Sequence, residues 1–355
     1  MNNDRIQEIL DLMEEARLDY FLISDPQSIA YCTGYYNDPH ERMFVFMISK
    51  HGNHTLFMND LFYLEHDLDV NIVWHKDGQD AIQTIVDEMH FPGRIGIDKN
   101  WASHFLLDLM KKLPDAKYIN ASPCVDLVRM KKDLQEQVLM IESSKINDAV
   151  MEEIIPFIQE GVTEKQLAKK LDELFFNHHS TCYGAIVAFG KNAADPHHEN
   201  DDTLLRKGDC VLIDMGCVYK GYCSDMTRTF FYEGILEEEI KVYEIVKKAN
   251  EAAEAMIKPG VKLSDIDKCA RKVISDEGYG KYFTHRLGHF IGQDVHEYGD
   301  VSSVNEMEVE EGMIFSIEPG IYLEGNFGVR VEDLVMVTKD GCQVLNSFTK
   351  DIYII

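Results

Sequence analysis

The feature that most constrains this sequence is a set of acidic residues placed in apolar, strand-like stretches of its second half. Asp214 ends one apolar run, and Asp225 follows eleven residues later in a second strand-like stretch. Glu318 ends a third run, and Glu332 lies inside a fourth. A buried, ionised carboxylate is costly in free energy unless it is paired with a cation or coordinates a metal. The pattern therefore indicates that these side chains share a chemical role.

A histidine-containing segment, THRLGHFIGQDVHE, lies between the two pairs of acids. Four converging carboxylates would repel each other, and two divalent cations would neutralise them. An oxygen-rich set with one imidazole suits manganese, cobalt, iron or zinc. Two such ions about 3.5–4 Å apart form a hydroxide near neutral pH and polarise a substrate carbonyl. Each residue taken alone is more often structural, as a turn, strand-end or packed residue, so only the joint pattern favours a dinuclear metal site.

The composition excludes several other classes of function. The 355 residues include 35 Lys and Arg against 62 Asp and Glu, which gives a formal charge of −27. Such an acidic chain has no electrostatic footprint for nucleic acid and is repelled by an anionic membrane. No apolar run approaches the roughly 18 residues of a membrane span. The first residues do not resemble a secretion signal, and the eight scattered cysteines fit reduced thiols, so we expect a cytoplasmic protein.

The order of predicted elements indicates two domains. Residues 1–125 alternate between helix-like and strand-like segments, as in a mixed α/β domain, and no Gly-rich phosphate loop follows their strands. Residues 126–355 begin with a long helical pattern at about 133–158, and Thr163 with Gln166 forms a capping box for the next helix. The rest is strand-rich, with further helices near 237–257 and 264–277.

The order and spacing of the five metal-binding candidates resemble those of the pita-bread metallopeptidases, the fold of methionine aminopeptidase, aminopeptidase P and prolidase. The segments SDMTRTF, THRLGHFIGQDVHE, SIEPGIY and GVRVED are similar to that family's signature segments. An α/β domain ahead of them resembles the proline-specific branch. The resemblance implies a creatinase-like N-terminal domain over residues 1–125 and an α+β pita-bread catalytic domain over residues 126–355.

The resemblance also implies a role for each matching residue. Asp214 would bind one metal, His289 and Glu318 the other, and Asp225 and Glu332 would bridge both. Glu318 would in addition carry a proton from the attacking water to the leaving nitrogen.

Further residues match catalytic or supporting positions of the family. His197 and His296 would contact the substrate, although the adjacent His198 leaves the first assignment open by one residue. Substrate-binding or orienting roles are expected for the following residues: Thr227, His285, Arg286, Tyr322 and Arg330, together with the loop residues Asp38, His40, Glu41 and Arg42.

The implied function is metal-dependent hydrolysis of Xaa-Pro bonds, in small peptides with proline in second position, by a hydroxide that bridges two divalent metals. Manganese is the expected ion, with cobalt, iron or zinc as alternatives. The expected enzyme is an Xaa-Pro dipeptidase (prolidase) that forms a homodimer, in which the partner subunit's loop at residues 38–42 closes over the site. Two alternatives are an Xaa-Pro aminopeptidase acting on longer peptides and a non-catalytic binding module of the same fold.

Two departures from the family pattern bear on the substrate. Phe290 replaces the glycine that usually follows the histidine ligand, which predicts a bulkier pocket wall. No Lys or Arg occurs from Tyr298 to Ile317, where some prolidases hold the free proline carboxylate. In a dipeptidase, that task would fall to Arg286, Arg330 or Arg42 of the partner subunit.

Overall fold

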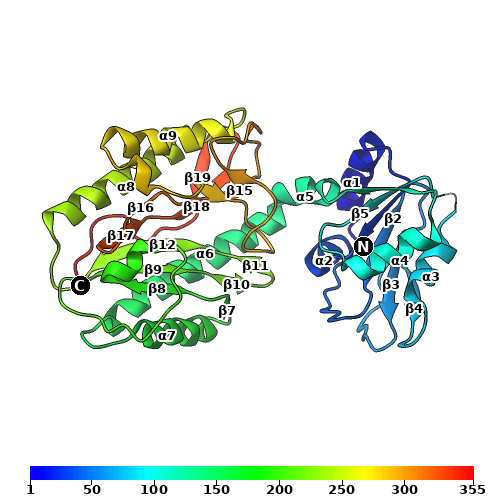
Figure 1. Ribbon diagram of the computed structural model, residues 1–355, viewed down its shortest axis with the longest axis horizontal. Coiled ribbons are helices and arrows are strands. Elements are labelled where there is room, and N and C mark those ends of the chain that lie inside the picture. The colour runs from blue at the N-terminus through cyan, green and yellow to red at the C-terminus, as the bar shows by residue number, and fades with distance from the viewer. Residues whose placement is uncertain (91) are drawn as a thin grey trace. The chain divides into compact units, whose positions relative to one another are not determined.

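The computed structural model describes residues 1–90 and 92–355, which divide into two compact units. The first unit is Met1–Arg129 and the second is Met130–Ile355. The division lies close to the boundary between residues 125 and 126 that the sequence predicts. Each unit has its own layers of helices and strands (Figure 1).

The first unit contains a mixed sheet with the order β4-β3-β2-β1-β5-β6 among the described residues. The central strand, β1, pairs antiparallel with β2 and parallel with β5. One apolar core lies between the sheet and α1, α2 and α5, and a second lies between the sheet and α3 and α4. The strands are β1 (Tyr20–Ile23), β2 (Val45–Ser49), β3 (Thr55–Asn59), β4 (Asn71–His75), β5 (Arg94–Ile97) and β6 (Lys117–Asn120). The helices are α1 (Asn3–Glu15), α2 (Pro26–Thr33), α3 (Ala81–Glu88), α4 (Ser103–Lys112) and α5 (Pro123–Met130).

The residues Ser24-Asp25-Pro26 after the apolar run Tyr20–Ile23 are typical of a turn that follows a strand, but the structure has the helix α2 there. The Asp25 side chain caps the helix by accepting a hydrogen bond from the Ser28 N–H. Pro26 stands in the first turn, where its missing N–H would have no partner in the helix and its fixed φ favours helix formation. Gly34 ends the helix in the left-handed conformation, with φ of 78°.

The second unit places its strands in several small sheets between two pairs of helices. Figure 1 shows α8 and α9 along one side of these strands and α6 and α7 along the other. The sheet β12-β9-β8 packs on α6 and α7 through a large apolar cluster. The helices are α6 (Leu134–Ile154), α7 (Glu164–Asn177), α8 (Glu237–Met256) and α9 (Leu263–Asp276). The strands are β7 (Thr181–Cys182), β8 (Ile186–Phe189), β9 (Cys210–Met215), β10 (Cys217–Tyr219), β11 (Tyr222–Cys223), β12 (Met226–Phe231), β13 (Gly288–His289), β14 (Asp300–Val301), β15 (Ile314–Ile317), β16 (Gly320–Leu323), β17 (Phe327–Arg330), β18 (Asp333–Val337) and β19 (Cys342–Val344).

The capping box predicted at Thr163 and Gln166 is confirmed at the start of α7. The Thr163 hydroxyl accepts from the Gln166 N–H at 3.1 Å, and the Gln166 side chain accepts from the Thr163 N–H at 2.9 Å. Asp133 and Glu136 form the same reciprocal pair at the start of α6. Both pairs fix the points at which the long helices of the second unit begin.

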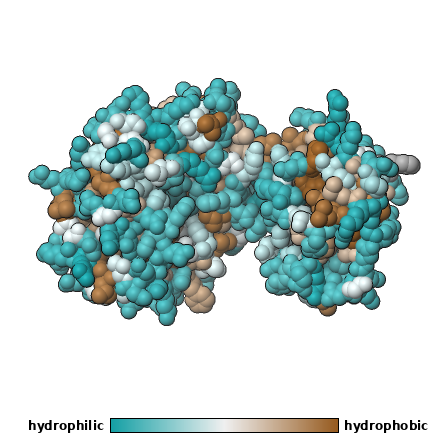
Figure 2. Space-filling view, viewed as in Figure 1, coloured by the Kyte–Doolittle hydropathy of each residue, from teal (hydrophilic) through white to brown (hydrophobic). Residues whose placement is uncertain are grey.

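Most of the visible face in Figure 2 is hydrophilic, with apolar residues in scattered groups. Within residues 1–90 and 92–355, no helix combines the length and the apolar character that crossing a membrane would require.

We expect Thr163→Ala to lower the free energy of unfolding by about 1 kcal/mol, because an N–H in the first turn of α7 loses its acceptor. Urea unfolding followed by circular dichroism measures the change. Thr163→Ser keeps a hydroxyl and serves as the control. An alanine variant as stable as the serine variant would contradict the capping role.

Candidate metal and catalytic centre

Two aspartates lie side by side on neighbouring strands of one sheet. Asp214 lies in β9, and Asp225 comes directly before β12. The two strands pair antiparallel, with Thr227 opposite Asp214. The hairpin β10–β11 connects them, so the chain returns to the same end of the sheet after it. This register brings both carboxylates to one pocket.

The two glutamates occupy the ends of strands in the other half of the unit. Glu318 directly follows β15. The expectation that Glu332 lies inside a continuous strand is wrong, because the chain leaves β17 at Arg330 and enters β18 at Asp333. β17 pairs with β16, whereas β18 pairs with β15, so Glu332 lies where the chain changes sheets. Its N–H donates to the Thr227 carbonyl at 3.1 Å, which joins the two halves at the site.

The histidine reaches the carboxylates because its strand approaches β15 very closely. A Cβ on Gly288 would stand 1.9 Å from the Ser316 carbonyl oxygen, so only glycine fits directly before His289. The His289 N–H donates to the Ser316 hydroxyl, which in turn donates to Glu318. The His289 Nε2 lies 3.6 Å from both the Asp225 Oδ2 and the Glu318 Oε1.

These side chains line a cavity of about 370 Å³ in the second unit. The five expected ligands all take part in its wall, together with His197 and His296, the two histidines expected to contact the substrate. The lining residues are Tyr183, Gly184, Ile186, Pro196, His197, Asp214, Asp225, His285, Arg286, His289, Val295, His296, Glu318, Arg330 and Glu332.

Crowding and burial disturb the ionisation of the carboxylates. Burial, with nearby Asp225 and Asp214, raises the pKa of Glu318 to about 7. Burial and the carboxylates of Asp225 and Glu318 raise the pKa of Glu332 well above its ordinary value. Burial and Asp225 also raise the pKa of Asp214, although Arg330 opposes them. Without cations, the pocket therefore favours protons on Glu318, Glu332 and Asp214.

Two histidines of the pocket, His289 and His296, have pKa values that are shifted in opposite directions. Burial alone would lower the pKa of His289, but Asp225 and Glu318 reverse the effect and raise it. Burial and the neighbouring His289 lower the pKa of His296 to about 4. The two rings lie 4.1 Å apart between centroids. His296 is therefore neutral at pH 7 and offers one donor and one acceptor nitrogen.

The donor set fits divalent cations. The Asp225 Oδ1 is buried, and no hydrogen-bond partner for it exists among the described residues. Asp225, His289 and Glu332 present ligand atoms that all lie within 4.8 Å of one another. A buried carboxylate oxygen without a proton donor is costly unless a cation meets it. Four carboxylates and one imidazole match the preferences of manganese and related ions.

A buried arginine and a threonine orient two of the carboxylates. The Arg330 guanidinium donates to the Asp214 Oδ2 at 2.6 Å and to the Thr227 hydroxyl at 3.0 Å. The Thr227 hydroxyl donates to the Glu332 Oε2 at 2.6 Å. Arg330 also donates to the Tyr322 hydroxyl, which contacts the His285 Nε2 at 2.8 Å. This chain of contacts fixes the carboxylates from behind.

The structure separates the roles of the adjacent His197 and His198. His197 lines the pocket. His198 instead points to the fully buried Glu164, with 2.7 Å between Nε2 and Oε2. Glu164 and His198 form with Asp201 a second cluster of metal-binding residue types, but Glu164 already accepts from the N–H groups of Phe189 and Asp201. These contacts favour His197 as the residue that meets a substrate.

The N-terminal loop and Arg286 stand in different surroundings. Asp38, His40, Glu41 and Arg42 belong to the first unit, where Arg42 pairs with Asp77 and Glu41 at the surface. The pocket described above is lined by residues of the second unit. Arg286 is one of them, and within the described residues no hydrogen bond or ion pair engages its guanidinium.

Tyr183 also lines the pocket, although nothing in the sequence near it indicated this. Its hydroxyl donates to the Ser224 carbonyl at 2.8 Å, next to Asp225. Gly216 makes room for it, because a Cβ there would stand 2.0 Å from the tyrosine oxygen. Gly216 directly after the Asp214-Met215 pair was the available signal, but sequence alone does not say which side chain fills the space.

Comparisons with known proteins agree with this geometry. The sequence model of metallopeptidase family M24 matches residues 138–339, and that of the creatinase/prolidase N-terminal domain matches residues 5–131. An uncharacterized peptidase of Staphylococcus aureus is 35% identical over 355 residues, which cover 98% of this chain and 99% of that protein. The structure of a dipeptidase from Pyrococcus horikoshii is 35% identical, has a TM-score of 0.92 and covers 99% of this chain and 100% of its own. For a prolidase from Thermococcus sibiricus the identity is 32%, the TM-score 0.94 and the coverage 100% and 99%.

These matches define a metal-dependent peptidase with a creatinase-type N-terminal domain. The chain belongs to metallopeptidase family M24. The resemblance stated from the sequence, the fold class and the prediction of an enzyme are thereby confirmed.

We expect His285 to make stability depend on pH. Burial, with Arg330, His197 and Arg271, lowers its pKa to about 4. In the unfolded chain the pKa of a histidine is about 6.5, so between pH 6.5 and pH 4 the unfolded chain binds a proton that the folded chain does not bind. The free energy of unfolding therefore falls as the pH drops from about 6.5 towards 4. His285→Asn should remove up to about 3 kcal/mol of this loss.

Urea unfolding of the parent and the variant at pH 7 and pH 4.5 measures the difference. The exposed His66→Asn is the matched control and should follow the parent. Equal pH dependence in the parent and in His285→Asn would refute the assignment.

Proposed function

We propose that this chain hydrolyses the Xaa-Pro bond of dipeptides, with two divalent ions held by Asp214, Asp225, His289, Glu318 and Glu332. The observation that carries the proposal is the convergence of four carboxylates on one imidazole, with the Asp225 Oδ1 buried and unpartnered among the described residues. When bound, the two ions would activate a water molecule and polarise the carbonyl of the substrate.

Glu318 is the proton carrier in this proposal. The leaving nitrogen of proline is a basic secondary amine, so it must gain a proton as the bond breaks. Glu318 stands at the end of β15 and its Oε1 is steadied by the Ser316 hydroxyl at 3.1 Å. A carboxyl group held there takes a proton from the attacking water and delivers it to that nitrogen.

His296 and His197 recognise the carbonyl group of the Xaa-Pro bond. His296 is neutral at pH 7, so one of its ring nitrogens donates to the oxygen on which negative charge develops. His197 lines the same cavity and contacts the substrate beside it. An Xaa-Pro bond has no N–H, so recognition through the carbonyl suits this substrate better than recognition through the amide.

Arg286 is the residue that holds the free carboxylate of proline. Arg330 is not available for that role, because Asp214, Thr227 and Tyr322 already occupy its guanidinium. Arg286 lines the cavity, and no ion pair engages it within residues 1–90 and 92–355. Arg286 would thus provide the positive charge that the chain lacks from Tyr298 to Ile317. An anchored carboxylate favours dipeptides over longer peptides.

The remaining parts of the proposal concern the ion and the assembly. Manganese is the preferred ion because the donors are mostly carboxylate oxygens. A cytoplasmic location is supported by eight cysteines that are all free of disulfides in the described chain. A homodimer, with the loop at residues 38–42 of the partner subunit over the site, rests on the resemblance of that loop to bacterial prolidases.

We expect the manganese-loaded protein to cleave Leu-Pro and to leave Leu-Pro-Gly intact at equal concentration. Chromatographic detection of free proline measures the first reaction. Glu318→Gln should keep the fold and lose turnover, because an amide cannot carry the proton. Preferential cleavage of Leu-Pro-Gly would favour the aminopeptidase alternative, and cleavage of neither peptide would favour a binding module.

We expect Arg286→Ala to raise KM for Leu-Pro by about tenfold or more, because a charge-assisted hydrogen bond contributes about 1.5–3 kcal/mol. Leu-Pro amide lacks the carboxylate, so its weaker cleavage should not change in the variant. Arg206→Ala, an exposed arginine of the same unit, is the matched control. An unchanged KM for Leu-Pro would show that another cation binds the carboxylate.

A further inference from the structure

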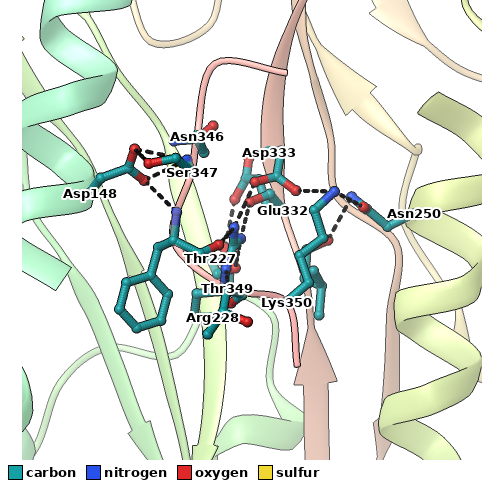
Figure 3. Close-up of polar contacts among 12 residues, drawn as sticks. Asp148, Thr227, Arg228, Asn250, Glu332, Asp333, Asn346, Ser347, Thr349 and Lys350 are labelled. Atoms are coloured by element: carbon teal, nitrogen blue, oxygen red, sulfur yellow. Dashed lines mark hydrogen bonds and ion pairs between the residues drawn. The ribbon is translucent and has the colours of Figure 1, made fainter. Parts of the chain in front are cut away.

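The segment Asn346–Lys350 lies against the back of the proposed metal centre. It follows β19 and falls beyond the residues that the family model matches, which end at 339. Figure 3 shows its side chains and carbonyl groups among polar residues that come from α6, β12, α8 and the chain around Glu332. Three separate routes lead from this segment to the expected metal ligands.

The first route runs through Asn346, which is buried. Its side-chain amide donates to the carbonyl of the expected ligand Asp225 at 3.2 Å. Its side-chain oxygen accepts from the Leu334 N–H at 2.7 Å. One side chain thus connects the strand after Asp225 with the strand after Glu332.

The second route runs through Arg228, which is only 1% exposed. Its guanidinium donates to the carbonyls of Phe348 and Thr349, at 2.8 and 3.1 Å. It also donates to the carbonyl of Glu332 at 2.7 Å and to the Asp333 carboxylate at 2.7 Å. The backbone of the segment and the backbone of Glu332, an expected ligand, are therefore both hydrogen-bonded to the Arg228 guanidinium.

The third route runs through Lys350 and Asn250. The Lys350 ammonium donates to the Asn250 Oδ1 at 2.7 Å and pairs with Asp333 and Glu254 at 2.7 Å each. The Asn250 amide donates to the carbonyls of Ile317 and Val331, at 2.9 and 3.4 Å. These two residues directly precede Glu318 and Glu332 in the sequence. Asn250 therefore joins the backbone directly before Glu318 to the backbone directly before Glu332.

The segment itself is firmly held. The Asp148 carboxylate of α6 accepts from the N–H groups of Ser347 and Phe348 at 2.8–3.0 Å and from the Ser347 hydroxyl at 2.7 Å (Figure 3). Ion pairs hold the residues around it, since Arg228 pairs with Asp333 and Lys350 pairs with both Asp333 and Glu254.

We infer that Asn250, Asn346 and Lys350 are positioning residues, through which the segment Asn346–Lys350 sets the geometry of the carboxylates for divalent ions. The inference rests on the proposed function, because it needs the metal centre to exist. Partners behind the ligands typically change metal affinity about 10–100-fold when removed. Side chains that bind the backbone next to a ligand set the separation of the ligand atoms. Their removal should therefore change metal affinity in the same way.

The test measures manganese affinity of the metal-free, full-length protein by isothermal titration calorimetry. Asn250→Asp removes the donor to Ile317 and Val331 but keeps the size of the side chain and an acceptor for Lys350. Lys350→Met removes the ammonium. Both changes make the surroundings more negative, which alone would strengthen cation binding. We expect instead that the dissociation constant for manganese rises about tenfold or more in both variants.

Lys247→Met is the matched control. Lys247 lies on α8 like Asn250, and it pairs with Asp351, the residue that follows the segment, at 2.5 Å. The Lys247→Met variant loses an ion pair beside the segment but no contact with the chain around Glu318 or Glu332. Its manganese affinity should therefore equal that of the parent. Lys350→Arg should recover part of the affinity that Lys350→Met loses.

The outcomes separate the two proposals. A parent protein that binds no manganese would overturn the proposed function, and the positioning role with it. A parent that binds manganese, together with parent-like affinity in folded Asn250→Asp, would overturn the positioning role alone. Near-UV circular dichroism of the metal-free variants reports folding. Asn250→Asp decides the matter if Lys350→Met does not fold.

Discussion

Repulsion between buried carboxylates is the constraint on which the rest of the catalytic unit depends. Asp214, Asp225, Glu318 and Glu332 share one cavity, and their burial together with their crowding raises the pKa of Glu318 and Glu332. Such an arrangement is unfavourable for folding alone, so other contacts must hold it. That support comes from the pairing of β9 with β12, from the hydrogen bond of Arg330 to Asp214, and from the buried ion pair of Arg228 with Asp333. On binding, two cations would take the place of the protons that these crowded carboxyl groups favour in their absence.

Local sequence patterns predicted most elements of the fold, because the longer helices carry their own start and stop residues. Thr163 with Gln166 marks the beginning of α7, as the structure confirms. The misses were the segments in which local chemistry is ambiguous. Asp25–Pro26 fits a turn and a helix start equally well, and packing against the sheet decides for the helix. The strand β4 is half-exposed at a sheet edge, so it lacks the apolar run that marks β2.

The candidate site divides in the same way. Acids in apolar, strand-like stretches are visible in a sequence, and the resemblance to the pita-bread family added His289, so the five residues expected to bind metal could be named and are found around one cavity. The partners of those residues could not be named, because they come from remote positions. Tyr183 and Asn250 carry no local mark, and the choice between His197 and His198 depends on Glu164, which lies more than thirty residues earlier. The break at Glu332 reflects a change of sheet that no local pattern records.

The place of Asn346–Lys350 in the chain orders events during biosynthesis. All five expected ligands precede this segment in the sequence. A ribosome makes the chain from its N-terminal end, and domains fold as units as they emerge. The first unit can therefore fold while the second is still being made. In the proposed arrangement, the carboxylates reach their final spacing only after Lys350 has been added and has left the ribosome. Tight metal binding would then begin only after this segment has emerged, and a shorter nascent chain would not capture ions in an incomplete geometry.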